Sequence, residues 1–220
     1  MRALGVIPAR GNSKRVPRKN LRQLCGRPLI QYTIEAASAA TKLTTFVVST
    51  EDYEIGHVAA NLGAYVVRRP DDLSGDDVTT GAVLKHALEY METEAAPSYD
   101  MVVCLHPTSP IRKDGDIDLA IELLWHSSLN SLASVCPLPI KTHPNIGTLV
   151  GGSFIGSSWP HYILNASIYA VRRDWLMVHG KHVADGGTSV LPLIMDRRHS
   201  LDIDDEIDLK VAELFLNDAN

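Results

Sequence analysis

Long apolar runs are missing from this sequence. The longest, such as Met101–Leu105, is far shorter than the roughly 20 residues that a membrane-spanning helix needs. The first residues lack the extended apolar stretch of a secretory signal and lead directly into a loop that contains glycine. We therefore expect a protein that works in the cytoplasm and has no membrane partner.

A surplus of positive charge is also missing. The 220 residues include 21 lysines and arginines against 26 aspartates and glutamates, which gives a formal net charge of −5. Proteins that bind nucleic acids or membrane surfaces usually carry a basic excess, so we expect neither partner. Six basic residues nevertheless fall within thirteen positions: Arg10, Lys14, Arg15, Arg18, Lys19 and Arg22. One basic cluster in an acidic protein favours a small anionic ligand bound at one place.

Cysteine is scarce, and several catalytic motifs do not occur. The three cysteines, Cys25, Cys104 and Cys136, have no CxxC spacing and are odd in number, which is typical of reduced thiols in a cytosolic protein. The patterns GxxxxGK(S/T), GxGxxG and GxSxG are absent. Their absence argues against a P-loop NTPase, a dinucleotide oxidoreductase and a serine hydrolase of the nucleophile-elbow type.

The composition itself is that of a folded domain. Hydrophobic residues make up 45% and charged residues 21% of a chain long enough to bury a core. Short β-branched runs alternate with amphipathic segments around residues 30–37, 55–62, 83–90, 117–124 and 207–214. This alternation predicts a three-layer α/β/α fold with a mostly parallel sheet. The predicted strands are Leu4–Ile7, Thr45–Ser49, Ala64–Val67, Met101–Leu105, Ser131–Cys136 and a returning strand at Leu164–Val171.

One segment interrupts this alternation. Residues at about 137–164 carry four prolines and four glycines, with a weak strand signal at Thr148–Val150. We predict a single domain over residues 1–220 with a short inserted hairpin there. Further along, His179 and His182 are three residues apart and are expected to lie on the surface.

Ligands of open α/β sheets bind outside the carboxyl ends of the strands. The segments that follow the predicted strands are Pro8–Asn20, Ser49–Asp52, His106–Arg112 and Asp202–Asp205. In the first of them, Arg10 offers a planar fork and Lys19 a point charge, while Gly11 and Ser13 permit close approach. This pattern fits a polyphosphate, although a solvated basic loop would have the same composition.

The segment near the carboxyl terminus is rich in aspartate. Asp202 and Asp204 alternate along a predicted strand, so both can point to one side, as two carboxylates that hold Mg²⁺ on substrate phosphates would. The alternative is that Asp204 or Asp205 caps the last helix. The two interpretations are compatible, because one aspartate can cap while two bind the metal.

The sequence resembles the cytidylyltransferases that activate acylneuraminate and related nonulosonic acids. Residues Ile7–Asn20 read IPARGNSKRVPRKN, close to the family pattern (I/L)(P/A)ARxxSKx(I/V/L)PxKN. Further matches follow in the order of the family: RPDDLSGD at Arg69–Asp76, LHPTSPIR at Leu105–Arg112, NASIY at Asn165–Tyr169, and DID with Asp208 and Glu213 from Asp202 onward. Together they span most of the chain.

The resemblance implies a Rossmann-like fold of the nucleotide-diphospho-sugar transferase type and the transfer of CMP from CTP to a sugar acid, with release of pyrophosphate. It implies catalytic roles for Arg10, Lys19, Asp202 and Asp204, of which Asp202 and Asp204 would hold Mg²⁺. The nucleotide-binding positions would be Arg10, Gly11, Asn12, Ser13, Lys19, Asn20, Arg69, Thr80, His106, Pro107, Thr108 and Ser109. Asn165 and Tyr169 would lie on the acceptor side, and relatives usually form homodimers through the middle segment.

Several positions depart from the family. His106 replaces a base-reading glutamine, and Ala166 and Ser167 replace glycine and alanine. Ile163 stands where an acceptor-facing arginine is usual, and residues 137–164 contain no arginine. Lys141, His143 or His161 is expected to compensate on the acceptor side. Two other functions therefore stay open. One is a nucleotidyltransferase for a sugar phosphate or another keto acid, or with another nucleotide; the other is a nucleotide-binding protein without activity.

Overall fold

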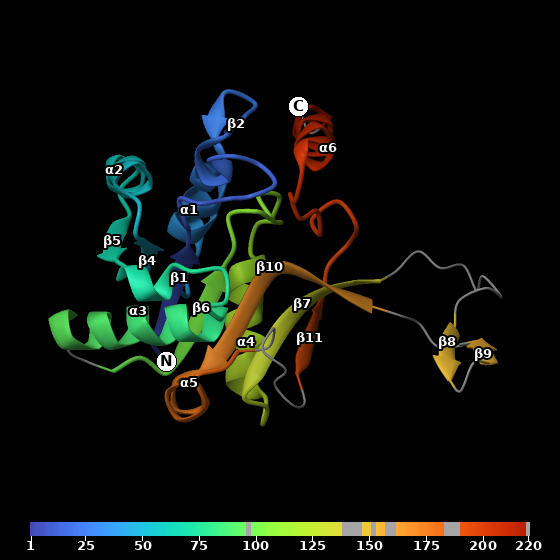
Figure 1. The fold of residues 1–220 in the computed structure, drawn as a ribbon. Coiled ribbons are helices and arrows are strands. Elements are labelled where there is room, and N and C mark those ends of the chain that lie inside the picture. Colours follow the sequence, from blue (N-terminus) through green and yellow to red (C-terminus); the bar gives the residue numbers. More distant parts are fainter. Residues whose placement is uncertain (96–97, 138–146, 151–152, 157–161, 183–189, 219–220) are drawn as a thin grey trace.

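A computed structural model describes residues 1–95, 98–137, 147–150, 153–156, 162–182 and 190–218. Its main strands are β1 (Ala3–Pro8), β4 (Thr45–Thr50), β5 (Tyr65–Arg68), β6 (Met101–Leu105), β7 (Ser131–Pro137), β10 (Tyr162–Arg172) and β11 (Leu191–Ile194). They form a seven-stranded sheet in the order β11-β7-β10-β6-β1-β4-β5 (Figure 1). β10 runs antiparallel to β6 and β7, whereas the other neighbours pair in parallel. The predicted α/β class with a mostly parallel sheet is confirmed.

Helices cover both faces of this sheet. They are α1 (Leu29–Ala39), α2 (Tyr53–Asn61), α3 (Thr80–Ala95), α4 (Asp116–His126), α5 (Arg173–His179) and α6 (Glu206–Asn217), with short 3-10 turns η1 (Lys19–Leu21) and η2 (Asp71–Leu73). Alternate residues of β1 face opposite sides. Ile7 packs in the cluster that contains side chains of α1, α2 and α4, while Leu4 and Val6 pack in the cluster that contains those of α3 and α5.

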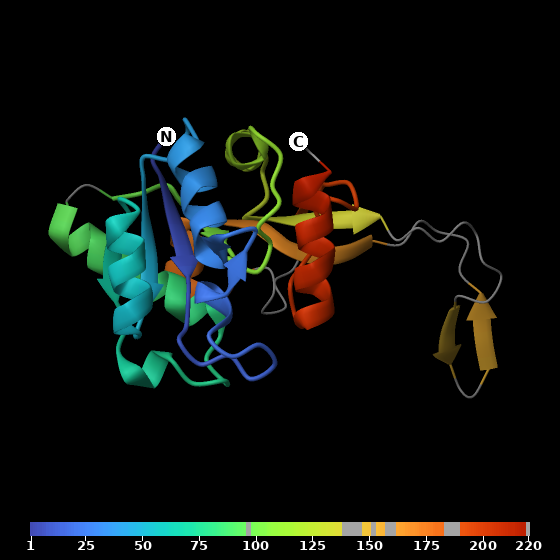
Figure 2. The same ribbon diagram turned by 90° about the horizontal axis from the view of Figure 1, so that it is seen from above.

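The last helix packs against the first part of the chain. A third hydrophobic cluster joins Val16 and Leu24 near the amino terminus to Ile203, Leu209 and Ala212 near the carboxyl terminus. Figure 2 shows α6 beside this amino-terminal segment, which includes the small β2 (Gln23–Leu24) and β3 (Arg27–Pro28) ribbon. The segment that follows β1 and the segment that leads into α6 therefore pack together.

The middle segment contains a hairpin, as predicted. β8 (Gly147–Val150) and β9 (Ser153–Gly156) pair antiparallel in a sheet of their own. The flanking strands extend further than expected, because β7 includes Pro137 and β10 begins at Tyr162, not at Leu164. No strand or helix was predicted for β11 or α5, which have only four and seven residues. None of the helices in the described ranges is long and apolar enough to span a membrane.

Candidate active site

A cavity of about 660 Å³ opens at the carboxyl ends of β1 and β6. The loop after β1 contributes basic and small polar residues to the lining of this cavity: Arg10, Ser13, Lys14, Arg15, Lys19 and Asn20. Arg69, the loop 73–78, and Thr80 and Val83 of α3 form a second wall. His106, Pro107 and Thr108 after β6 form a third, and Asp204 completes the cavity. Its size and its position at the strand ends suit a nucleotide.

Residues from the two ends of the sequence meet inside this cavity. Lys19 Nζ donates to the carbonyl oxygen of Ile203 at 2.7 Å and lies 3.5 Å from Asp204 Oδ1. Arg15 Nη1 lies 2.7 Å from the other carboxylate oxygen of Asp204. The structure therefore places the basic loop and the aspartate segment, which are more than 180 positions apart, at one site.

Asp202, unlike Asp204, is not among the residues that line the cavity. The segment from 201 to 204 is not a strand, contrary to the sequence prediction; it is held instead by the N–H of Ile203, which donates to Thr108 O at 2.7 Å. Burial raises the pKa of the Asp202 carboxyl, and the charge of Asp204 raises it further, although a hydrogen bond from Thr108 opposes both. Asp202 Oδ1 is buried without a hydrogen-bond partner.

These features fit a divalent cation. An unpartnered buried carboxylate oxygen beside a second carboxylate is a hard-ligand environment that a cation would relieve. No group of three or more histidine, cysteine or acidic side chains in the described part of the chain is arranged to hold a metal. Mg²⁺ at Asp202 and Asp204 would thus need phosphate oxygens and water as its other ligands.

The cap of the last helix leaves both of these carboxylates unused. Asp205 is the N-cap of α6: its side chain accepts the N–H groups of Ile207 and Asp208, and the Asp208 carboxylate accepts the N–H of Asp205 in return. Of the two candidate caps, it is therefore Asp205 that caps the helix. Asp204 is left to face Lys19 and Arg15.

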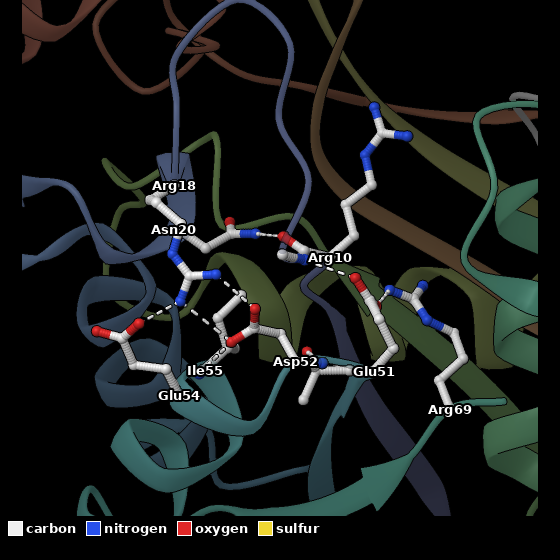
Figure 3. A network of polar contacts seen from close by, with 10 residues as sticks. Arg10, Arg18, Asn20, Glu51, Asp52, Glu54, Ile55 and Arg69 are labelled. Atoms are coloured by element: carbon white, nitrogen blue, oxygen red, sulfur yellow. Dashed lines mark hydrogen bonds and ion pairs between the residues drawn. The ribbon is translucent and has the colours of Figure 1, made fainter. Parts of the chain in front are cut away.

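The loop after β1 is held from behind by acidic residues that follow β4 (Figure 3). Glu51 Oε1 accepts the N–H of Gly11 at 2.6 Å, and Glu51 Oε2 accepts Arg69 Nη2 at 2.6 Å. Burial alone would raise the pKa of Glu51, but the hydrogen bonds from Arg69 and Gly11 outweigh it and lower that pKa. Glu51 is therefore ionised and ties the loop to the buried Arg69 of the pocket wall.

A second set of contacts fixes the far end of the same loop. Arg18, whose φ of 56° lies in the left-handed region, places its guanidinium 2.5 Å from Asp52 and in contact with Glu54. Asp52 also caps α2 by accepting the N–H of Ile55 at 3.0 Å, and Asn20 Nδ2 donates to Arg10 O at 2.9 Å. Sequence reasoning missed Glu51, Asp52 and Arg18 as supports of the site. The available signal was their place after predicted strands: Arg18 falls in Pro8–Asn20, and Glu51 and Asp52 fall in Ser49–Asp52.

Gly11 lets Asp52 pack closely against the loop after β1. Its N–H is already bound by Glu51, and it does not line the cavity. A Cβ at this position would lie 2.4 Å from Asp52 Oδ2, which is closer than real contacts allow. The glycine is therefore required by the approach of Asp52, and its nucleotide-binding role stays a prediction.

We expect Gly11→Ala to destabilise the protein by about 1–3 kcal/mol, the usual cost of overpacking. It should also weaken the CTP binding that the family resemblance implies, because the loop must shift. Thermal unfolding with and without CTP measures both effects. Gly56→Ala is the matched control: its Cβ would meet Val66 at 3.5 Å, an ordinary contact, and alanine inside α2 should stabilise slightly. Equal stability of Gly11→Ala and the parent protein would contradict this steric argument.

Arg10 reaches across the mouth of the cavity. Its Nη1 lies 2.7 Å from Asp76 Oδ1, and Lys14 Nζ lies 2.5 Å from the other oxygen of Asp76. The contacts of Lys14 and Arg10 lower the pKa of Asp76. All three side chains are largely exposed, so these pairs are weak and an arriving phosphate can replace Asp76.

The turn after β6 contributes neutral groups. His106 lines the cavity, and burial lowers its pKa to about 3, so the ring is neutral at physiological pH. Ser109 donates its N–H to His106 O at 3.3 Å, but its side chain is buried and donates to Asn165 O at 3.1 Å. Of the predicted nucleotide-binding residues, Gly11, Asn12 and Ser109 are not among those that line the cavity. Their roles stay predictions.

The residues assigned to the acceptor side point inward. Asn165 is buried: its Oδ1 accepts Ser134 Oγ at 2.5 Å and the N–H of Ser167, while its Nδ2 donates to Ser200 Oγ at 2.8 Å. Tyr169 is buried as well, and burial raises its pKa to about 12. Neither lines the cavity. An acceptor role for them stays a prediction, and Lys141, His143 and His161 lie outside the described residues.

The local backbone explains why Asn165 turns inward. The register of β10 against β7 shifts between Leu164 and Tyr169, and Ala166 adopts a φ of 56°. This is the position at which the family pattern has glycine, which adopts the left-handed region without strain. The surface position predicted for His182 is wrong. His182 follows the end of α5 and is buried, and its ring lies edge-on to the ring of Tyr169.

Comparison with known proteins identifies the family of this chain. A sequence model of the family described as cytidylyltransferase matches residues 4–137. The chain is 34% identical to a CMP-N,N'-diacetyllegionaminic acid synthase of Legionella pneumophila, over 97% of this chain and 95% of that protein. It is 29% identical to the N-acylneuraminate cytidylyltransferase of Escherichia coli over 95% of this chain, but spans only 51% of that longer protein. A pseudaminic acid cytidylyltransferase of Campylobacter jejuni is 41% identical over 50% of this chain and 48% of its own length.

Solved structures share the fold at low sequence identity. A CMP:2-keto-3-deoxy-manno-octonic acid synthetase complexed with CTP matches with a TM-score of 0.76 and 17% identity, over 100% of both chains. The 4-diphosphocytidyl-2C-methyl-D-erythritol synthase of Anaerococcus prevotii matches with a TM-score of 0.70 and 12% identity, over 98% of this chain and 96% of that one. These similarities establish the predicted Rossmann-like fold.

Proposed function

Because the chain belongs to the cytidylyltransferase family, we propose that it transfers CMP from CTP to the anomeric hydroxyl of a nonulosonic sugar acid and releases pyrophosphate. The observation that carries this proposal is the contact of Lys19 with Ile203 and Asp204 inside one cavity. A binding protein needs cations for phosphates, but it does not need carboxylates beside them. Cations together with carboxylates are what phosphoryl transfer with a metal requires.

The reaction needs positioning and charge neutralisation more than covalent help from the protein. The acceptor oxygen forms a bond to the α-phosphorus while the bond between the α- and β-phosphates breaks. Lys19, Arg15 and Arg10 surround the space for the phosphates, and the network of Glu51 keeps the loop that carries them in place. Mg²⁺ held by Asp202 and Asp204 would neutralise phosphate charge as it develops. A cytoplasmic location goes with the proposal, because the reaction consumes a nucleoside triphosphate.

The acceptor class comes from the relatives. Their names specify acylneuraminate, diacetyllegionaminic acid and pseudaminic acid, which are all nonulosonic acids. The acceptor's carboxylate would need a partner other than the arginine that Ile163 replaces. Ile163 is 53% exposed and offers no charge, so the choice among these acids depends on other groups.

The test is a panel of nucleotides and acceptors scored by pyrophosphate release. CTP with at least one of the three acids and Mg²⁺ should give release, and chelation of the metal should abolish it. Release from another nucleotide but not from CTP, or only with a sugar phosphate, would identify a different nucleotidyltransferase. CTP binding that needs no metal, without turnover on any acceptor, would identify a protein that only binds the nucleotide.

We also propose that the protein is a homodimer. Three consecutive apolar side chains at the start of β10, those of Tyr162, Ile163 and Leu164, are about half exposed, and such a row favours burial against another surface. A second copy is the occupant that the family resemblance favours. Light scattering after gel filtration should give twice the chain mass, and Ile163→Asp should return it to the mass of one chain. A monomeric parent protein would refute this.

A further inference from the structure

His106 is held on several sides at the uncharged part of the cavity. Its carbonyl oxygen accepts Arg112 Nη2 at 2.7 Å, which fixes the backbone. Its ring meets the ring of Tyr169 nearly edge-on, with centroids 5.8 Å apart and planes at 82°. Its Nε2 lies 3.4 Å from the sulfur of Cys104. The ring orientation is therefore set by the protein before any ligand arrives.

The position of Cys104 follows from strand geometry. Cys104 is on β6, two residues before His106, so both side chains leave the same face of the sheet. The thiol is fully buried in the cluster that contains Leu84 and Ala87 of α3. Cys104 is not among the residues that line the cavity, whereas His106 is.

The chemistry of this contact determines where the ring proton resides. Burial, with smaller contributions from His182 and Arg112, lowers the His106 pKa to about 3, so the ring is neutral and has one N–H and one bare nitrogen. Sulfur is a weak acceptor, whereas a neutral imidazole nitrogen is a good one. The favourable arrangement is therefore the thiol donating to Nε2, which leaves the ring proton on Nδ1.

The surroundings indicate what His106 faces. Four of the five basic side chains that line the cavity come from the loop after β1, and the fifth, Arg69, is paired with Glu51. Thr80, Val83 and Pro107 are among the uncharged residues that line the cavity with His106. A nucleotide has a charged end and an uncharged end. The phosphates belong with Arg15 and Lys19, so the base belongs with His106.

We propose that Cys104 is a positioning residue that fixes the ring proton of His106 on Nδ1, so that the ring presents one N–H donor to an acceptor atom of the cytosine. The identity of the ligand rests on the proposed function, whereas the proton position does not. In this arrangement the histidine offers the base a single donor of fixed direction. It does not offer the paired donor and acceptor that a glutamine amide has.

The proton position can be measured on the free protein. In protein labelled with ¹⁵N at histidine, the ring nitrogens of His106 are identified by their absence from His106→Gln. We expect a protonated Nδ1 and a bare Nε2. Cys104→Ser, which keeps a donor, should preserve this pattern; Cys104→Ala and Cys104→Val, which remove it, should not. Cys136→Ala is the matched control, because Cys136 is also a buried cysteine but lies on β7, away from the cavity.

Kinetics supply the second readout. Loss of one neutral hydrogen bond to the base should raise KM for CTP about fivefold in Cys104→Ala and Cys104→Val, with little change in kcat, since the contact is equal in ground and transition states. Cys104→Ser and Cys136→Ala should keep the KM of the parent protein.

Each possible outcome decides a part of the proposal. A parent spectrum with the proton on Nε2 overturns it, as does an unchanged spectrum in Cys104→Ala and Cys104→Val. An altered spectrum with an unchanged KM for CTP overturns the assignment of His106 to the base. Absence of turnover with every nucleotide would refute the proposed function, and the ¹⁵N spectra of the free protein would still decide the role of Cys104.

Discussion

Replacement of Lys19 by alanine is expected to lower pyrophosphate release at least about a hundredfold while the protein stays folded. The Lys19 side chain is 12% exposed, and its ammonium group contacts the segment of Ile203 and Asp204 at the cavity. Alanine removes a fixed positive charge where the departing pyrophosphate gathers negative charge. Single-turnover pyrophosphate release at saturating CTP is the measurement, with circular dichroism as the check on folding.

The control for Lys19 is a nearby contact of the same kind. Arg22 also joins the amino-terminal segment to the carboxyl-terminal one, with its Nη2 3.1 Å from Glu206, but it does not line the cavity. Arg22→Ala should leave turnover close to that of the parent protein. If both variants lost activity equally, the junction of the two segments would matter and not the charge of Lys19. Turnover of Lys19→Ala like that of the parent would refute its role.

Asp202→Asn is expected to lower turnover strongly and to stabilise the fold at the same time. Asp202 Oδ1 is buried without a hydrogen-bond partner, and both burial and Asp204 disfavour the charged form. An amide of the same shape removes the penalty of the buried charge, so the free energy of unfolding at pH 7 should rise by about 1 kcal/mol. Turnover should fall at least about a hundredfold, because one of the two carboxylates proposed to hold Mg²⁺ is lost.

The stability difference between Asp202→Asn and the parent protein should depend on pH. The folded-state pKa of Asp202 is raised above the ordinary value of 3.8. The folded protein therefore binds this proton more tightly than the unfolded chain does, and the parent protein loses stability as pH rises through that pKa. The advantage of Asp202→Asn should thus be full at neutral pH and vanish below about pH 3.8, where the carboxyl is protonated in both states.

Denaturant unfolding of both proteins at pH 7 and at pH 3.5 measures that difference. Asp205→Asn, at the helix cap, is the control, because its carboxylate accepts two backbone N–H groups and its loss should not stabilise the protein. If Asp202→Asn proved less stable than the parent protein at neutral pH, the buried carboxylate would not be a source of instability and the argument from its missing partner would fail.

The alternation of strands and helices was predictable, because period-two and period-3.6 patterns depend on local sequence. For the site, the strand pattern predicted which segments follow the strands, but not how the side chains in those segments are arranged. Among adjacent carboxylates such as Asp204 and Asp205, local sequence does not say which one caps the helix; the anchoring of Ile203 to Thr108 decides it. The inward turn of Asn165 depends on a register shift between two strands, and no pattern within one strand reveals that shift.

The supports of the basic loop were missed for a similar reason. A glutamate after a strand reads as an ordinary surface residue. Glu51 supports the loop because it binds Gly11, about 40 positions upstream, and Arg69, 18 positions downstream. Burial of His182 likewise depends on Tyr169, which comes from another element. The roles of such residues depend on tertiary contacts, which composition and periodicity do not reveal.

The contact between the first and last segments of the fold has a consequence for biosynthesis. Lys19 leaves the ribosome early, whereas Ile203 and Asp204, which it contacts, emerge more than 180 positions later. A nascent chain can pair β1 with β4 and β6 long before that, yet it has no complete nucleotide site until α6 has been released and has packed onto Leu24. Competence to bind the proposed nucleotide is therefore acquired only after nearly all of the fold has been synthesised.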